Sequence, residues 1–287
     1  MKKSLLLKRI TPLIVIVYCV SCNGCSSLRD TTTEDNLNVV LEGMAEKEVF
    51  SFEGAATLLR GGEPLPNSTL YYGGEVEELT KLSLYTLLSD RSLSNKTASS
   101  GVKDLKNSGS LVQSYYSHLE KKAGKWELQA ATHSPQEFNP LPALNPLAQL
   151  EGLKEVEKQV TEEVGAGRGT KVLRFELAPA EARNQLTHEL DREMMILRPE
   201  LHNDDQKSTE DELKLTKARI ELWQKKNSQL QQKLEQAKIE TVYYLTLDKK
   251  YNLPRRLTLN RKVSYPSESN KSAIETYVTQ VYFYDYR

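Results

Sequence analysis

Three cysteines, Cys19, Cys22 and Cys25, are the only ones in the chain, and they form a C-x-x-C-x-x-C row. Thiols at this spacing suggest an iron–sulfur cluster or a zinc site. A cluster needs a fourth thiolate or an equivalent ligand, which the chain lacks. The histidines lie far from the row in sequence, so a zinc site would have no imidazole nearby. We therefore expect neither a metal site nor a cofactor here.

The segment before the cysteines has the pattern of a secretory signal. Residues 2–9 form a basic head without acidic residues, and the apolar run PLIVIVYCV follows at 12–20. A membrane-spanning helix needs about 20 apolar residues, and polar residues follow this shorter run directly. A basic head, a short apolar segment and small residues predict a signal peptide over residues 1–21.

A small residue directly before a cysteine at such a junction resembles the lipobox of bacterial lipoproteins. There the cysteine is lipidated and becomes the first residue of the mature protein. Cys22, which follows Val20 and Ser21, fits best, and Cys25 is the alternative. Plain secretion and an uncleaved anchor also stay open. We expect a palmitate-type lipid on Cys22, which would hold the chain at the outer face of the bacterial cytoplasmic membrane.

Charge and composition limit the function classes. The chain has 39 Lys+Arg and 39 Asp+Glu, with 38% hydrophobic and 27% charged residues. These values suit a globular protein and not one with many membrane spans. A balanced charge gives no case for a nucleic-acid partner. Removal of the basic head leaves a mildly acidic chain, so the membrane contact would depend on the lipid and not on anionic headgroups.

Motifs of the common enzyme classes are absent from the sequence. It contains no G-x-S-x-G elbow, no H-E-x-x-H pair, no P-loop and no G-x-G-x-x-G turn. The glycine-rich GAGRG at 165–169 precedes an expected strand and not a helix, so it indicates a hairpin turn. We therefore expect that the protein is not an enzyme.

The mature chain is expected to begin with a polar tether at 22–35 and an amphipathic helix over 34–47. The period then changes to that of strands. These are predicted at 49–59, at 68–89 (one or two strands, broken at Gly73-Gly74), at 124–134, 170–178, 239–250, 255–266 and 273–287. A polar loop covers 90–110, and Asn145-Pro146 starts a short helix. KEVEKQVTEEV at 154–164 suits either a helix or a hairpin strand, and its position favours the hairpin.

Residues 180–238 differ from the rest, because their apolar residues follow a helical period. The second half keeps a seven-residue repeat in two rows, which are Leu213, Ile220, Asn227, Leu234 and Thr216, Trp223, Leu230, Ala237. Such a repeat predicts an antiparallel helical hairpin with coiled-coil character. The hairpin either packs on its parent domain or offers a surface for a partner.

Together these elements predict an α+β fold. In the segment 255–266, Leu257, Leu259 and Val263 alternate with polar residues, as in an antiparallel sheet with one dry face. We expect a curved antiparallel sheet, a half-barrel, covered by helices and carrying a helical hairpin insertion at about 180–238. Residues 36–287 would form a single domain.

Tyrosine is the one enriched residue type, with 14 copies. Several stand in doublets, and the last three, Tyr282, Tyr284 and Tyr286, are expected on one strand face. They suit ordinary sheet packing or an aromatic wall for a hydrophobic ligand or a peptide. The candidate ligand-facing or partner-facing residues are Tyr244, Leu257, Leu259, Tyr282, Tyr284 and Trp223.

The strand FSFEGAATL and the strand–turn–strand YYLTLDKKYNLPRRLTLNRKV, after a lipidated cysteine and an amphipathic helix, resemble the LolA-like superfamily. This superfamily includes lipoprotein carriers, RseB-type stress sensors and mycobacterial lipid-binding lipoproteins. The resemblance implies a curved sheet closed by helices over an apolar cavity, which would bind a hydrophobic ligand or lipid. The alternative is a non-enzymatic scaffold or regulator of an envelope protein, for example in sporulation or germination, acting through the helical hairpin.

Overall fold

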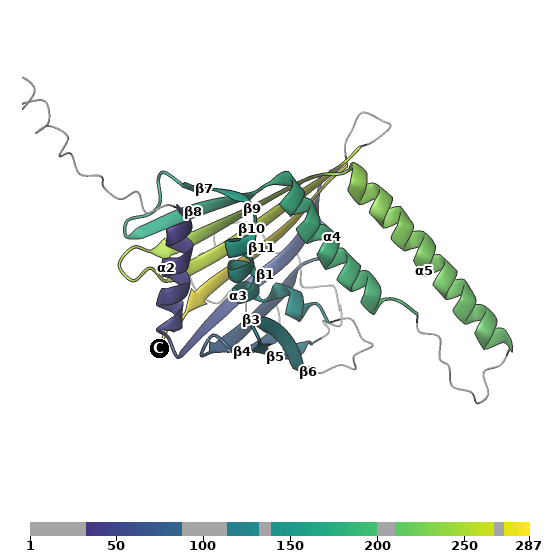
Figure 1. The fold of residues 1–287 in the computed structure, drawn as a ribbon, viewed down its shortest axis with the longest axis horizontal. Helices are drawn as coiled ribbons and strands as arrows, with labels where there is room; N and C mark the ends of the chain where they lie inside the picture. The colour runs from purple at the N-terminus through teal and green to yellow at the C-terminus, as the bar shows by residue number, and fades with distance from the viewer. Residues whose placement is uncertain (1–32, 88–113, 132–138, 200–209, 267–272) are drawn as a thin grey trace, which may run out of the picture.

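The computed structural model describes residues 33–87, 114–131, 139–199, 210–266 and 273–287 (Figure 1). Its helices are α2 (Thr33–Ala45), η2 (Leu141–Leu144), α3 (Pro146–Glu155), α4 (Pro179–Ile196) and α5 (Glu210–Gln236). Its strands are β1 (Val49–Arg60), β2 (Glu63–Pro64), β3 (Leu70–Glu77), β4 (Lys81–Thr86), β5 (Tyr116–Lys122), β6 (Lys125–Ala131), β7 (Lys158–Glu162), β8 (Thr170–Leu177), β9 (Lys238–Asp248), β10 (Pro254–Tyr265) and β11 (Ala273–Tyr284). The predicted signal peptide, Cys22 and the loop at 90–110 lie outside the described residues.

The described strands form one curved antiparallel sheet in the order β6-β5-β4-β3-β1-β11-β10-β9-β8-β7, with β2 paired to β1 at the side. Neighbours in the sheet follow one another in sequence, apart from the short β2 between β1 and β3, except at the centre, where β1 pairs with β11. The two edge strands, β6 and β7, do not pair with each other. The sheet is therefore an open half-barrel, and the predicted α+β fold class is confirmed.

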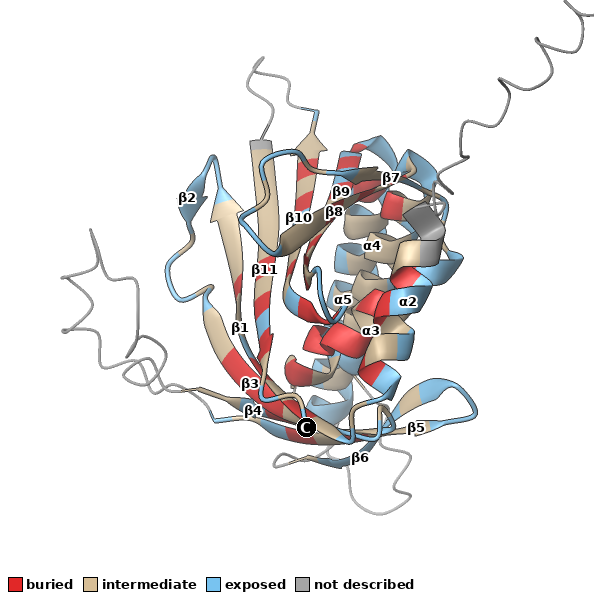
Figure 2. Cartoon of the chain, turned by 90° about the vertical axis from the view of Figure 1, so that its left-hand side faces the viewer, coloured by how far each residue is buried: buried red, intermediate tan, exposed pale blue. Residues whose placement is uncertain are grey.

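The connection between the two edges explains why helices cover the concave face. The chain leaves β6 at one edge and enters β7 at the other, and η2 and α3 lie in between. Figure 2 shows α2, α3 and α4 on the concave side of the sheet. Asn145 starts α3 as expected, because its side-chain oxygen accepts hydrogen bonds from the backbone N–H of Leu147 and Ala148.

The core lies where α2 and α3 meet the concave face. Helix α2, predicted over 34–47, buries Leu37, Val40 and Met44. Alternate residues of β1 face it, and both Phe50 and Phe52 are fully buried. Because side chains alternate between the two faces of a strand, every second residue of each strand points toward the helices. These residues together form the dry face of the sheet.

Gly73-Gly74 does not break the strand, contrary to expectation. Strand β3 runs through both glycines, and the chain turns later, at Glu78 and Leu79, which both have positive φ. A Cβ at Gly74 would lie 2.5 Å from a ring atom of Phe52 and 2.3 Å from the carbonyl oxygen of Ser83. Gly74 therefore leaves space for a core phenylalanine and is not a turn residue.

The end of the chain also differs from expectation. Strand β11 stops at Tyr284, because Asp285 adopts a left-handed conformation with φ 54°. The Tyr286 ring therefore packs 5.1 Å from the Phe50 ring, and its hydroxyl donates to the Pro254 carbonyl at 2.7 Å. Tyr286 does not share a face with Tyr282 and Tyr284. Strand β5 was not expected at all, whereas β7 and β8 form the favoured hairpin.

Helices α4 and α5 form the predicted antiparallel hairpin. Near the sheet, Arg183 donates to the carbonyls of Leu234 and Ala237. Farther along, Trp223 Nε1 donates to the Met194 carbonyl at 2.8 Å. None of the helices in the described ranges is both long enough and apolar enough to cross a membrane.

Candidate functional site

A cavity of about 1010 Å³ lies between the concave face of the sheet and helix α4. Strands β1, β10 and β11 form its floor, α4 forms the opposite wall, and η2 and β6 close one side. Most of the lining side chains are apolar, among them Ala56, Leu58, Leu70, Leu144, Leu186, Leu190, Ile196, Leu259 and Val263. The cavity is at the upper end of the size range of small-molecule sites.

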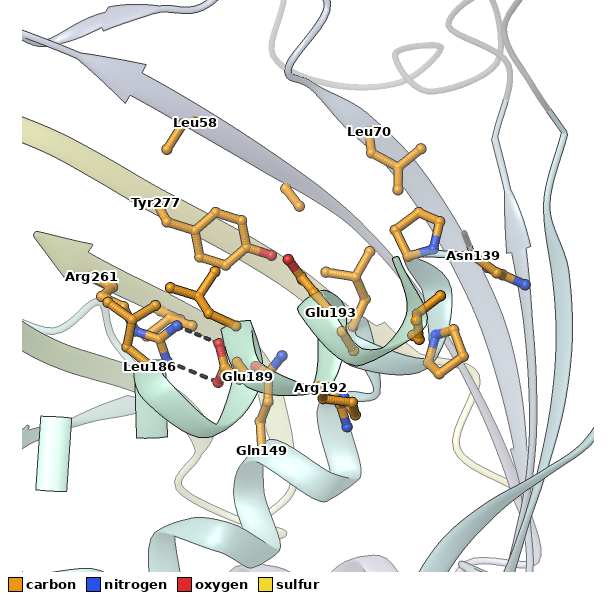
Figure 3. A pocket seen from close by; sticks show the side chains of 18 of the residues that line it. Leu58, Leu70, Asn139, Gln149, Leu186, Glu189, Arg192, Glu193, Arg261 and Tyr277 are labelled. Atoms are coloured by element: carbon orange, nitrogen blue, oxygen red, sulfur yellow. Dashed lines mark hydrogen bonds and ion pairs between the residues drawn. The ribbon is translucent and has the colours of Figure 1, made fainter. Parts of the chain in front are cut away.

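The cavity exists because α4 packs on β9 and not on the centre of the sheet. At its first turns α4 is held by the contacts of Arg183 to the end of α5 and by Gln185, whose Nε2 donates to the Tyr243 hydroxyl at 2.9 Å. The next turns pass over β10 and β11 and leave space beneath them (Figure 3). Leu186, Leu190 and Ile196 face this space.

An ion pair links the floor of the cavity to α4. The guanidinium of Arg261, which is 2% exposed, donates to the two carboxylate oxygens of Glu189 at 2.5 and 3.0 Å. It also donates to Gln185 Oε1 at 3.1 Å. Burial by itself would lower the pKa of Arg261, but the hydrogen bonds and charge of Glu189 outweigh it and raise that pKa. Arg261 therefore keeps its positive charge.

Glu193 lies one helical turn beyond Glu189 on α4. In Figure 3 its carboxylate points toward the Tyr277 hydroxyl, whereas the Arg192 guanidinium points away from it. Burial, followed by the charge of Glu189, raises the pKa of Glu193, and Arg192 opposes this in part. Burial also raises the pKa of Tyr277 well above its ordinary value, so its hydroxyl keeps its proton.

A second ion pair lies at the rim of the cavity. Arg60 of β1 donates to Glu275 of β11 at 2.7 Å, and both residues are on the concave face. Glu275 lines the cavity, and its charge raises the pKa of the partly buried Tyr265, after the larger effect of burial. The cavity is thus a mainly apolar space with charged groups at defined positions.

The residues proposed from sequence lie in different places. Leu259 lines the cavity. Leu257, two residues earlier on β10, is buried in the core. Tyr244, Tyr282 and Tyr284 are on the convex face, where Tyr282 is 50% exposed. Trp223 lies between α4 and α5. Their roles toward a ligand or partner stay predictions from sequence.

The polar residues of the cavity were not recognised from sequence. Those on the facing surfaces of α4 and the sheet include Glu189, Glu193, Tyr243, Arg261 and Tyr277, and Gln185 bonds to Arg261 from outside the lining. One signal was available, because the alternation of Leu257, Leu259 and Val263 puts Arg261 on the dry face. A buried arginine requires a partner. The sequence does not show that this partner is Glu189.

The ranges that the structure describes contain no group of three or more His, Cys, Asp and Glu that could hold a metal ion. The three cysteines fall outside these ranges, so the interpretation of their row stays a prediction from sequence.

Comparisons with known proteins give distant structural similarity. No family model and no curated protein match the chain. Among solved structures, a lipovitellin described for its lipid–protein interactions aligns at a TM-score of 0.35 and 8% identity, over 83% of this chain and 25% of that one. The chain thus spans a quarter of that lipovitellin.

Two bacterial structures align over nearly their whole length. The lipoprotein LppX of Mycobacterium tuberculosis has a TM-score of 0.31 and 10% identity, with 90% of this chain and 96% of that one covered. A DUF1329 family protein from Desulfovibrio piger has a TM-score of 0.26 and 10% identity, with 89% and 92% covered. Scores below 0.5 establish neither a shared fold nor a shared function, so the cavity itself carries the functional argument.

Proposed function

We propose that this protein is a non-catalytic binding protein that holds a hydrophobic ligand in the cavity between the concave sheet and α4. The observation that supports this is a space of about 1010 Å³ with a mainly apolar lining. Apolar surface left open to water is unfavourable, at about 25 cal/mol per Å² relative to burial. A ligand that covers this surface would therefore gain free energy, whereas a purely structural core would be filled.

The test uses two neighbouring alanines on opposite faces of β1. Ala56 lines the cavity and Ala55 faces the convex side. Native mass spectrometry of detergent-free protein should show a bound lipid in the chain with both Cys22 and Cys25 replaced by Ala, which removes the expected lipidation. Ala56→Phe should lower ligand occupancy, and Ala55→Phe should leave it unchanged. An empty protein that also takes up no fluorescent naphthalene probe would rule out the proposal.

We also propose that a lipid on Cys22 anchors the protein to the outer face of the cytoplasmic membrane. The support is the sequence alone, namely a basic head, a short apolar run and Ser21 before Cys22. Labelling of cells with a radioactive fatty acid tests this. The label should be lost in Cys22→Ala and kept in Cys25→Ala, and the reverse result would assign the lipid to Cys25.

The alternative function, a scaffold that binds an envelope protein through α4 and α5, has a separate observation in its favour. Leu215 and Leu222 of α5, seven residues apart and therefore on one face of the helix, are 53% and 55% exposed. Exposed apolar residues that share a face can form a contact surface. Replacing Leu215 and Leu222 with Lys should abolish the cellular phenotype without changing ligand occupancy if the scaffold is the main role. A wild-type phenotype would exclude it.

A further inference from the structure

The cavity has a polar position that is separate from its two ion pairs. Glu189 is paired with Arg261, and Glu275 with Arg60. Glu193 also lines the cavity, but the ion pairs among the described residues include none with it. Its carboxylate points at the Tyr277 hydroxyl on the opposite wall. The wall of α4 therefore presents one carboxylate that is available to a ligand.

The cations of the cavity are not equally available. Both terminal nitrogens of Arg261 are bound to Glu189, one of them also to Gln185, and its Nε is buried with no partner. A buried Nε cannot meet a ligand in the cavity. Arg192 is exposed and points away from the Tyr277 hydroxyl. The carboxylate of a fatty acid would thus find a carboxylate and a neutral hydroxyl at this position, and neither cation that lines the cavity in the described ranges is free and directed at it.

We propose that Glu193 and Tyr277 bind the polar head of an amphiphile, and that this head is a protonated amine. This inference rests on the proposed function, since it places an alkyl chain along the apolar lining. An ammonium group would donate one hydrogen bond to the Glu193 carboxylate and another to the Tyr277 oxygen. Charge-assisted hydrogen bonds of this type are about twice as strong as neutral ones. The pairing also compensates a partly buried carboxylate, which is otherwise costly.

The experiment compares three ligands that share one alkyl chain, namely decylamine, decan-1-ol and decanoate. Each displaces a fluorescent naphthalene probe from the full chain with Cys22 and Cys25 replaced by Ala. We expect decylamine to bind about tenfold more tightly than decan-1-ol, from the usual strength of a hydrogen bond to a charged group. Decanoate should bind most weakly, because it meets Glu193.

Glu193→Gln should bring the affinity for decylamine down to that for decan-1-ol, while the affinity for decan-1-ol stays the same. The unchanged alcohol affinity also shows that the variant is folded with an intact cavity. Glu221→Gln, on the exposed side of α5, is the matched control and should keep the amine preference. Tyr277→Phe should lower amine affinity by a smaller factor, since it removes one neutral acceptor.

The outcomes separate the two proposals. If the three ligands bind equally, or if the amine preference survives Glu193→Gln, the head-group proposal is wrong and the apolar cavity stands. If decanoate binds best, the proposal that the ligand head beside Glu193 and Tyr277 is positively charged is wrong. If no ligand displaces the probe, both the head-group proposal and the proposed function fail.

Discussion

Arg261 of β10 and Glu189 of α4 are joined by a two-pronged ion pair, although they are 72 positions apart in sequence. The pair is asymmetric, because the Arg261 side chain is 2% exposed and that of Glu189 is 38% exposed. It connects the floor of the cavity to the helix above it. The distance between sheet and helix thus depends on two side chains from distant parts of the chain.

Replacing Glu189 with Leu should strongly destabilise the protein, because Arg261 would stay buried without its counter-charge. We expect a loss of about 3 kcal/mol in the free energy of unfolding, measured by urea denaturation. The double variant Glu189→Leu with Arg261→Leu should recover most of this loss, since it buries no lone charge. A double variant as unstable as the single one would show that packing, and not charge, explains the effect.

Gly74→Ala should also destabilise the protein, because the new Cβ would clash with Phe52 and with the backbone at Ser83. Overpacking of this kind costs about 1–3 kcal/mol. Gly152→Ala is the matched control, since it lies in α3 with no atom within 4 Å of the added Cβ. There the better helix propensity of alanine should stabilise by up to about 1 kcal/mol. Thermal unfolding of both variants tests the contrast.

Glu193 should make the protein less stable as the pH rises. Burial and the charge of Glu189 raise its folded-state pKa above the unfolded value, Arg192 opposes this in part, and Tyr277 on the facing wall stays neutral. The folded state then holds more protons between the two pKa values, so stability is complete below the unfolded pKa and falls as pH passes through the raised folded pKa.

Replacing Glu193 with Gln removes this penalty. The variant should have a higher Tm than wild type near neutral pH, and the difference should vanish below about pH 4, where both states of wild type are protonated. Differential scanning calorimetry at the two pH values measures it. An equal rise in Tm at both would mean that Gln acts by packing and not through the carboxylate.

Trp223 should hold the far part of α4 and α5 together. Its Nε1 bonds to the Met194 carbonyl, and Arg198 stacks 5.5 Å from the centre of its ring. Trp223→Ala should raise hydrogen exchange in α4 after Asp191 and in the facing turns of α5, and leave β9, β10 and β11 unchanged. Increased exchange throughout the sheet would mean that the hairpin and the sheet unfold as one unit.

Local patterns predicted much of the fold. The period of two along 255–266 identified β10, and Asn145-Pro146 marked the start of α3, because strand alternation and helix capping depend on neighbouring residues. The heptad rows likewise predicted the antiparallel pairing of α4 and α5. Each of these signals is complete within a few turns or a few residues of sequence.

The arrangement around the cavity depends on residues that are far apart. The doublet Tyr243-Tyr244 shows that one tyrosine faces each side of β9, but not that Tyr243 is the inner one. Gly73-Gly74 had the composition of a turn, yet a ring from another strand explains it. The pairing of Arg261 with Glu189 was not predictable, because it follows from where α4 crosses the sheet.

The position of β1 beside β11 has a consequence for biosynthesis. The Arg60–Glu275 contact at this central seam joins residues 215 positions apart. Strands β3 to β6 can pair as a local meander, and so can β7 to β11, but the seam cannot form until β11 has been made. Such non-local pairing makes folding slow. A nascent chain would stay in two incomplete halves, exposing the unpaired edges of β1 and β10, until β11 has been made.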